Sequence, residues 1–366
     1  MPPGRDSETL ARRFRSFARV QFRGRSPLYE RLSLGVADDA ELLDLAARCR
    51  PGQLEPLLLF AAVHLSLADD SAHPLVQWFP TLGGVRHPAR DDPLPALRSL
   101  CRERRASLEA LVATRRVQTN EPTRCAALLP GVVAAGRWAA RPLAVVELGA
   151  SAGLSLRFDR YAYAYGESSR AGPPGSPVRL TCRLEGAGLP PTGPMPAVAR
   201  RLGLDASPID IRDPTGAAWL RALVWPEHLD RARVLDAALV AAAADPPHVR
   251  RGDVLDGLAG AADETPRGAT LCVLHSALLP YLSRAERGRL AELVERLGRW
   301  RDVAWLSLEG PGLLVTPGGA EVDASPDPEG RDCFLLHLAT VRRGRAAARL
   351  LARAGPHGQW LEWLAS

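Results

Sequence analysis

One stretch constrains the fold of this chain more than any other: residues 145–154, VVELGASAGL. The apolar residues 143–146 predict a buried strand, Gly149 to Gly153 predict a tight turn, and residues 154–161 predict the start of a helix. Small residues let backbone N–H groups and a helix N-terminus approach a ligand closely. The stretch therefore predicts a strand, a loop and a helix that together bind a polar or anionic group.

Three interpretations of this loop stay open on the sequence. In the first, Glu147 ends the strand and the loop holds the amino-acid and ribose part of a cofactor, as in nucleotide-binding α/β folds. In the second, residues 149–153, GASAG, satisfy G-x-S-x-G and make Ser151 the nucleophile of a serine hydrolase. In the third, the small residues only pack a helix against a sheet.

The net charge of +6 comes from arginine alone among the basic residues, and the arginines are scattered among acidic residues along the chain. A nucleic-acid-binding protein gathers its basic residues on one face or helix. We therefore expect no nucleic-acid partner.

The six cysteines lie far apart, without a C-x-x-C pair or a histidine at metal-ligand spacing beside them. We expect reduced thiols and no metal site. The N-terminal residues have no apolar segment of a signal peptide, and the longest apolar run, 57–67, is about half the length that a membrane span needs. The sequence thus predicts a cytoplasmic protein without a membrane partner.

The chain changes character along its length. Residues 1–115 show helical periodicity, with expected helices at 8–34, 40–49, 56–67 and 95–114. From residue 143 onward, apolar strands alternate with helices, which is typical of a parallel sheet. We therefore predict an N-terminal helical region, 1–115, and an α/β domain, 116–366.

Two segments flank the first predicted strand–helix unit. Residues 114–124 hold several hydrogen-bonding side chains, among them Gln118, Asn120 and Arg124. After the unit, Tyr161, Tyr163 and Tyr165 alternate, and a Gly- and Pro-rich insertion, 166–200, predicts a lid over the site. Gln118, Asn120, Arg124 and Tyr165 are the candidate substrate contacts.

Polar residues end successive predicted strands: Glu147, Asp205, Asp253 and His275. Ligands of open α/β sheets bind outside the carboxyl ends of the strands. A carboxylate after the second strand can accept from both ribose hydroxyls, and one after the third can accept from an adenine amino group. The hydrolase alternative instead needs an acid and a histidine after Ser151, for which Glu309 with His337 or His357 are candidates.

Four motifs resemble, in order, the cofactor-side motifs of class I S-adenosylmethionine-dependent methyltransferases: residues 147–153, 203–208, 252–254 and 274–282. In the first motif Ser151 replaces the central glycine of the usual G-x-G-x-G. More closely, nearly the whole chain resembles a bacterial family of unknown function, DUF2332. The stretches shared with that family include 118–121, 145–161, 219–227 and 356–363.

The resemblance implies a Rossmann-like methyltransferase sheet and S-adenosylmethionine as cofactor. It implies a methyl transfer to an unidentified small molecule, with His275 as the base, while a possible protein partner is not identified. The alternatives are a serine hydrolase and a non-catalytic subunit with the methyltransferase fold. The cofactor contacts that it implies are Glu147, Gly149, Ala150, Ser151, Gly153, Asp205, Asp253 and Val254.

Overall fold

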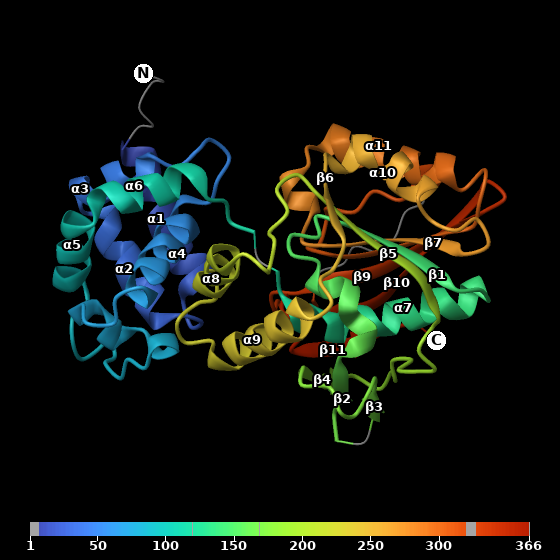
Figure 1. Ribbon diagram of the computed structural model, residues 1–366, viewed down its shortest axis with the longest axis horizontal. Helices are drawn as coiled ribbons and strands as arrows, with labels where there is room; N and C mark the ends of the chain where they lie inside the picture. The colour runs from blue at the N-terminus through green and yellow to red at the C-terminus, as the bar shows by residue number, and fades with distance from the viewer. Residues whose placement is uncertain (1–6, 119, 168, 320–326, 366) are drawn as a thin grey trace. The chain divides into compact units, whose positions relative to one another are not determined.

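The computed structural model describes residues 7–118, 120–167, 169–319 and 327–365, and it divides into two compact units (Figure 1). Unit 1 comprises Met1–Thr119 and Asp213–Arg233, and unit 2 comprises Asn120–Arg212 and Val234–Ser366. The predicted α/β class is confirmed, because the structure combines helices with an 11-stranded sheet. Within the described residues, no helix is both long enough and apolar enough to cross a membrane.

Unit 1 is helical, as its apolar periodicity predicts. The single helix expected at 8–34 is interrupted, because Gly24 adopts a φ of +71° and Pro27 begins a new helix whose N-cap is Ser26. Asp39 caps the next helix by accepting hydrogen bonds from the N–H groups of Glu41 and Leu42. The helices are α1 (Ser7–Phe17), α2 (Pro27–Ala37), α3 (Ala40–Ala47), α4 (Glu55–Ala68), α5 (Leu94–Glu103), α6 (Arg105–Thr114), α8 (Pro214–Ala222) and the start of α9 (Leu229–Ala243).

Aromatic rings fill the core of unit 1. Phe22 packs edge-on against Tyr29 at 5.6 Å and against Trp225 at 5.1 Å between ring centroids. Close by in the sequence, the Glu227 carboxylate accepts hydrogen bonds from the Ser26 hydroxyl at 2.7 Å and the Leu28 N–H at 2.9 Å. A carboxylate at the start of α2 compensates the free N–H groups and the positive end of the helix dipole.

The sheet of unit 2 has the strand order β3-β2-β4-β11-β10-β9-β8-β7-β1-β5-β6. Strands β6, β5, β1, β7 and β8 are parallel, whereas β9 and β10 form an antiparallel hairpin beside β8. Every residue of β1 is buried, as expected for a parallel strand covered on both faces. The strands are β1 (Leu143–Leu148), β2 (Ala162–Tyr165), β3 (Ser169–Ala171), β4 (Arg179–Glu185), β5 (Val198–Asp205), β6 (Val249–Arg251), β7 (Thr270–Ser276), β8 (Val303–Glu309), β9 (Phe334–Arg342), β10 (Arg345–Ala354) and β11 (Trp360–Trp363).

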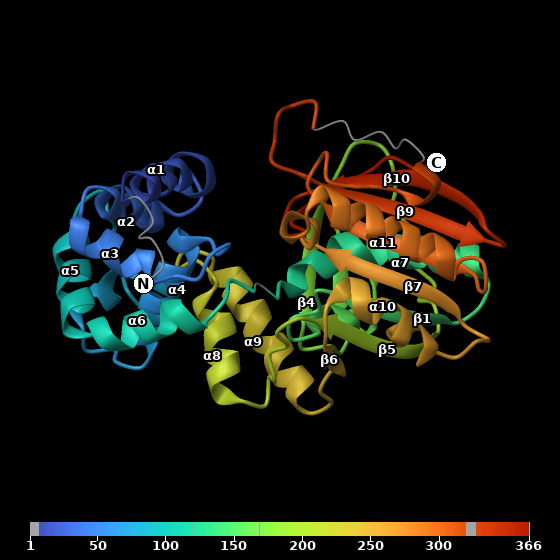
Figure 2. The ribbon, with the colours of Figure 1, turned by 90° about the horizontal axis from the view of Figure 1, so that it is seen from above.

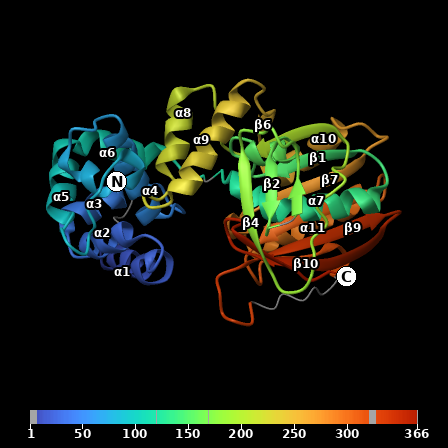
Figure 3. The same ribbon diagram turned by 90° about the horizontal axis from the view of Figure 1, so that it is seen from below.

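Helices cover both faces of this sheet. Helices α10 (Val254–Asp263) and α11 (Arg284–Leu297) lie on one face, toward the viewer in Figure 2. Helix α7 (Cys125–Ala139) packs on the other face against β4, β8 and β9, and Figure 3 shows it beside β4 from below. Val146, Val273 and Trp305 belong to the core between the sheet and α10 and α11. Because side chains alternate along each strand, neighbouring residues of a strand point to opposite faces of the sheet.

The segment that follows β1 differs from the expected α-helix. Residues Leu154–Arg160 form 3₁₀ turns, and the Tyr161 hydroxyl donates a hydrogen bond to the Leu154 carbonyl at 2.7 Å, which holds this short segment. A helix thus begins after Gly153 as expected, but it is a short 3₁₀ helix and not an α-helix. Tyr163 and Tyr165 lie on β2, and the segment 166–200 supplies β3 and β4, with β4 paired to β2 and β11. Its action as a lid stays a prediction.

Candidate functional site

In the loop after β1, three residues adopt left-handed backbone conformations. The backbone N–H groups of this loop donate hydrogen bonds to other groups of the protein. Gly149, Ser151 and Gly153 have φ values of +70°, +53° and +74°. The N–H of Gly149 donates to the Leu204 carbonyl at 2.8 Å, and that of Gly153 donates to the Ala150 carbonyl at 2.7 Å. The predicted cofactor residues of this loop are therefore brought together, but these N–H groups do not point to an open ligand site.

Two side chains hold this loop in place. The Asp205 carboxylate accepts from the Ser151 N–H at 2.8 Å and from the Ser207 N–H at 2.7 Å. The Asn120 side chain donates to the Ala150 carbonyl at 3.2 Å and accepts from the Leu154 N–H at 3.0 Å. Asp205 and Asn120 thus position the loop in this structure. The sequence instead predicts a ribose contact for Asp205 and a substrate contact for Asn120.

Glu147 is the most unusual group at this edge of the sheet. Its side chain is buried, and its Oε2 atom has no hydrogen-bond partner among the described residues. Burial raises the pKa of the Glu147 carboxyl to about 8, with a further increase from Asp205, while a hydrogen bond from Ser155 and the charge of Arg124 oppose the shift. A carboxylate in this setting gains stability when a cation arrives beside it.

His275 lies on the opposite face of the sheet. Glu147 pairs in register with Leu274, so the next residue, His275, points toward α10 and α11. Its Nδ1 atom is 2.7 Å from Oε1 of Glu309, and that carboxylate also accepts from the N–H groups of Leu278 at 2.9 Å and Leu279 at 3.3 Å. Because the carboxylate accepts, Nδ1 carries the proton and Nε2, which is buried without a described partner, presents its lone pair.

The other predicted residues have structural roles in this conformation. Asp253 is the N-cap of α10, accepting from the N–H groups of Leu255 and Asp256, and Val254 packs in the core beside it. The Tyr165 hydroxyl is buried and donates to the Ala126 carbonyl at 2.7 Å. Gln118 belongs to unit 1, whereas the residues of this sheet edge belong to unit 2.

A contact between two distant segments was missed by the sequence analysis. Arg124 donates through Nε to the Pro356 carbonyl at 3.0 Å, and His357 Nδ1 lies 3.6 Å from the Glu121 carboxylate. Both segments belong to the stretches that resemble one family, although nothing in their spacing predicts that they meet. Glu121 follows directly on Asn120, and the contacts of Arg124 and His357 join this segment to residues 356–357.

Among the described residues, Ser151 is not brought together with the acid and histidine that a serine hydrolase needs. Ser151 is 4% exposed, and its hydroxyl has no hydrogen-bond partner among the described residues. Glu309 pairs with His275 rather than with His337 or His357. A search of the described residues also finds no group of three His, Cys, Asp or Glu side chains arranged to hold a metal ion.

The comparisons with known proteins place the chain in a family. A family profile described as an uncharacterized protein conserved in bacteria (DUF2332) matches residues 11–363. The chain belongs to this family. The match confirms the resemblance to DUF2332 that its sequence motifs indicate. No curated protein and no solved structure matches the chain.

Proposed function

We propose that this DUF2332 protein binds S-adenosylmethionine at the carboxyl ends of β1 and β5 and transfers its methyl group to a small molecule. The strand order supports this assignment. Across the parallel half of the sheet the order is β6-β5-β1-β7-β8, so the chain reverses direction across the sheet between β1 and β7. Open α/β sheets bind nucleotide-bearing ligands at such a reversal point, as in Rossmann-like folds.

The proposal rests on Glu147, whose carboxylate is buried and whose Oε2 atom has no hydrogen-bond partner among the described residues. S-adenosylmethionine has a sulfonium and an ammonium group, and a cation beside Glu147 favours the ionised carboxylate. When bound, this cofactor supplies an electrophilic methyl group. Glu147 binds the cationic part, while Asn120 and Asp205 keep the loop beside it in one conformation.

The proton balance of binding tests this proposal directly. At pH 7 the Glu147 carboxyl, with a pKa of about 8, is mostly protonated. Binding of S-adenosylmethionine should then release up to about one proton, because the cation lowers that pKa. Calorimetric titration in two buffers of different ionisation enthalpy measures the released proton together with the affinity, and S-adenosylhomocysteine, which lacks the sulfonium charge, should release less.

Matched variants distinguish the contribution of Glu147 from that of other carboxylates in the same unit. Glu147→Gln should remove the proton release and weaken binding by about tenfold or more, since it loses a charged contact worth roughly 1.5–3 kcal/mol. Glu292→Gln, which changes an exposed carboxylate on α11 of the same unit, should leave both unchanged. If folded wild-type protein does not bind the cofactor at millimolar concentration, the proposal fails.

His275, the base that the resemblance implies, is fully buried and lies on the face of the sheet opposite to Glu147, with Nδ1 bonded to Glu309. It can act on a methyl acceptor only if that acceptor reaches Nε2 from the side of α10 and α11. His275→Gln tests this role, because loss of a base should lower kcat while cofactor affinity stays within a few-fold. A lower free energy of unfolding with an unchanged kcat would instead assign His275 to packing.

The positive φ of Ser151, +53°, is the observation that favours the hydrolase alternative, because nucleophile elbows strain the serine backbone in the same way. A fluorophosphonate probe distinguishes the two enzymes. We expect Ser151 to stay unlabelled, and Ser151→Gly to keep or improve cofactor binding. Stoichiometric labelling of Ser151 would overturn the methyltransferase proposal, and cofactor binding without any turnover would favour a non-catalytic subunit.

A further inference from the structure

A second polar site lies at the other edge of the same sheet. A pocket with a volume of about 520 Å³ opens where β1, β7 and β8 begin and where β9 ends. Arg141 stands two residues before β1, Thr270 begins β7, and Asp302 precedes β8. The six residues of β1, at about 3.3 Å each, separate this pocket from the loop after β1 by roughly 20 Å.

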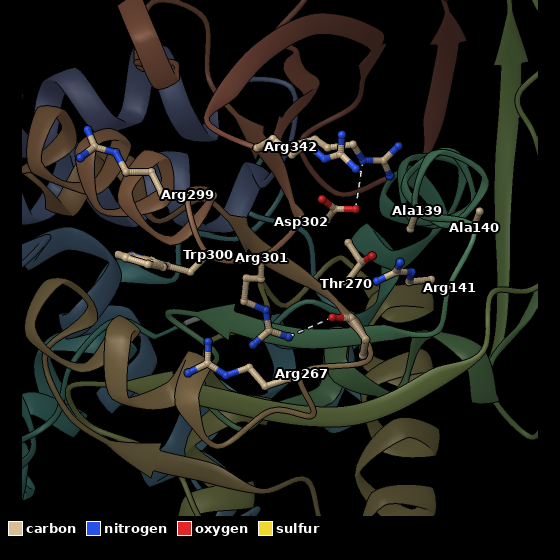
Figure 4. A pocket seen from close by; sticks show the side chains of 13 residues that line it. Ala139, Ala140, Arg141, Arg267, Thr270, Arg299, Trp300, Arg301, Asp302 and Arg342 are labelled. Carbon is tan, nitrogen blue, oxygen red and sulfur yellow. Dashed lines mark hydrogen bonds and ion pairs between the residues drawn. The ribbon is translucent and has the colours of Figure 1, made fainter.

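Arginines dominate the lining of the pocket, although they are scattered along the sequence. Six of them line it, against one carboxylate, that of Asp302 (Figure 4). Figure 4 shows Arg299 and Trp300 on one side and Arg141 on the other, with Asp302 and Arg301 between them. The six arginines are Arg141, Arg267, Arg299, Arg301, Arg342 and Arg343.

Two of these arginines have no partner in the described part of the protein. Asp302 already pairs with Nε of Arg342 at 3.0 Å, and the Arg342 guanidinium also lies 4.4 Å from the centroid of the Trp138 ring. No hydrogen bond or ion pair links Arg141 or Arg343 to a described side chain or carbonyl. Their positive charges are therefore available to a ligand.

Hydrogen bonds to backbone groups hold the loops that surround the pocket. Arg301 donates to the carbonyls of Ala262, Pro266 and Ala269 at 3.0–3.1 Å, which fixes the loop before β7. Burial lowers the pKa of Arg301, the charge of Arg267 lowers it further, and the charge of Asp263 opposes this shift. The Gly344 N–H donates to the Gly298 carbonyl at 3.2 Å and ties the β9–β10 turn to the loop after α11.

Arg343 occupies a backbone position that usually favours asparagine or glycine. It has a φ of +52° and is followed by Gly344 with a φ of +75° in the two-residue turn between β9 and β10. Such a turn favours asparagine or glycine at its first position, and a long side chain there costs about 1–2 kcal/mol of backbone strain. The unfavourable choice places a guanidinium at the rim of the pocket, which points to a ligand.

We infer that this pocket binds a small anion with a diphosphate group, held by Arg141 and Arg343. Guanidinium groups bind phosphate oxygens in pairs of parallel hydrogen bonds, and several arginines can hold two adjacent phosphates. The Thr270 hydroxyl, buried without a described partner in the wall of the pocket, is a further donor. Free pyrophosphate and a nucleoside diphosphate share this chemistry, and Trp300, with 82% of its surface exposed, offers a ring on which a base can stack.

Calorimetric titration of the full chain with pyrophosphate and with adenosine diphosphate tests this inference. Arg343→Asn should weaken the binding of both by about tenfold or more, because one charged hydrogen-bonding group is lost. The same variant should keep or raise the melting temperature, since asparagine suits the turn. Trp300→Ala should weaken only the nucleotide if the base stacks there, and should change neither affinity if the ligand is the bare diphosphate.

Arg284→Asn is the control, because it removes the same charge from an exposed position on α11 of the same unit. It should leave both affinities unchanged. Equal weakening by Arg284→Asn and Arg343→Asn would show only diffuse attraction and overturn the site. Absence of pyrophosphate binding by the folded wild type at millimolar concentration, or binding of oligonucleotides alone, would also overturn it.

Discussion

The carboxylate of Asp205, at the end of β5, accepts a hydrogen bond of 2.8 Å from the backbone N–H of Ser151, in the loop after the neighbouring β1. Its other oxygen accepts from the Ser207 N–H at 2.7 Å. One side chain therefore joins the loops that follow two adjacent strands. In the proposed cofactor site, Asp205 acts mainly by fixing the loop around Ser151.

Substitution of Asp205 tests this role. Asp205→Ala should destabilise the protein by about 2 kcal/mol, because the buried N–H of Ser151 and the partly buried N–H of Ser207 lose their acceptor, at roughly 1–3 kcal/mol for a buried group. Asp205→Asn keeps one carbonyl oxygen and should cost less. Urea denaturation measures both values, and a loss of cofactor binding in Asp205→Asn without any loss of stability would identify Asp205 as a direct ligand contact instead.

Glu147 should give the free energy of unfolding a characteristic dependence on pH. Its folded pKa, about 8, lies above the value of 4.5 expected in the unfolded chain. The folded state thus binds the proton more tightly, so the stability from this group is fully present below pH 4.5 and is lost as the pH rises to about 8. Within this window the slope should approach about −1.4 kcal/mol per pH unit.

Glu147→Gln removes this titration while it keeps the size of the side chain. The difference in free energy of unfolding between the wild type and this variant, measured in urea at several pH values from 5 to 8, isolates the contribution of Glu147. The variant should become more stable relative to the wild type as the pH rises. A constant difference across this range would show that Glu147 is not protonated in the folded protein.

Local sequence patterns predicted much of this fold, because the parallel strands are apolar runs and several helices have clear caps. Helix α7 was not predicted, since Pro130, Gly131 and Gly136 disfavour a helix in isolation. Its buried setting explains them: a Cβ atom on Gly131 would lie 2.5 Å from Leu306 of β8. Close packing against the sheet outweighs helix propensity there.

The site was harder to predict than the strands, because its contacts join residues far apart in the sequence. The sequence indicated that Glu147, Asp205 and His275 end neighbouring strands. It did not indicate that Glu147 and His275 face opposite sides, since a one-residue offset in register decides the face. The pairing of Glu309 with His275, 34 residues away, likewise depends on the adjacent positions of β7 and β8.

Substitution of His275 and substitution of Glu309 should lower the free energy of unfolding by different amounts. Glu309→Ala removes the acceptor of the imidazole and of two backbone N–H groups, and should destabilise the protein by about 3 kcal/mol or more. His275→Ala leaves Glu309 with both backbone donors and should cost less. A double-mutant cycle in urea measures the coupling, and additive costs would show that the two side chains do not interact.

Glu227 should stabilise unit 1 through the start of α2. Glu227→Ala removes the acceptor for the Ser26 hydroxyl and the Leu28 N–H, and should cost about 1–2 kcal/mol, as the loss of other helix caps does. Glu8→Ala is the control, because its side chain is 76% exposed and pairs with Arg12 on the surface of α1. Thermal unfolding of both variants checks this, and equal melting temperatures would argue against the cap.

The contact between residues 121–124 and 356–358 depends on Gly358. A Cβ atom there would lie 2.3 Å from the Thr123 carbonyl, and its φ is +74°. Gly312 has nearly the same φ, +75°, but no atom within 4 Å of the corresponding position. Gly312→Ala should therefore cost only the backbone strain, about 1–2 kcal/mol, whereas Gly358→Ala must also displace the backbone at Thr123. We expect the Gly358 variant to be clearly less stable and to bind cofactor more weakly, because Asn120 lies just before the displaced segment. Equal free energies of unfolding for the two variants, measured in urea, would show that the two segments do not pack as closely as described.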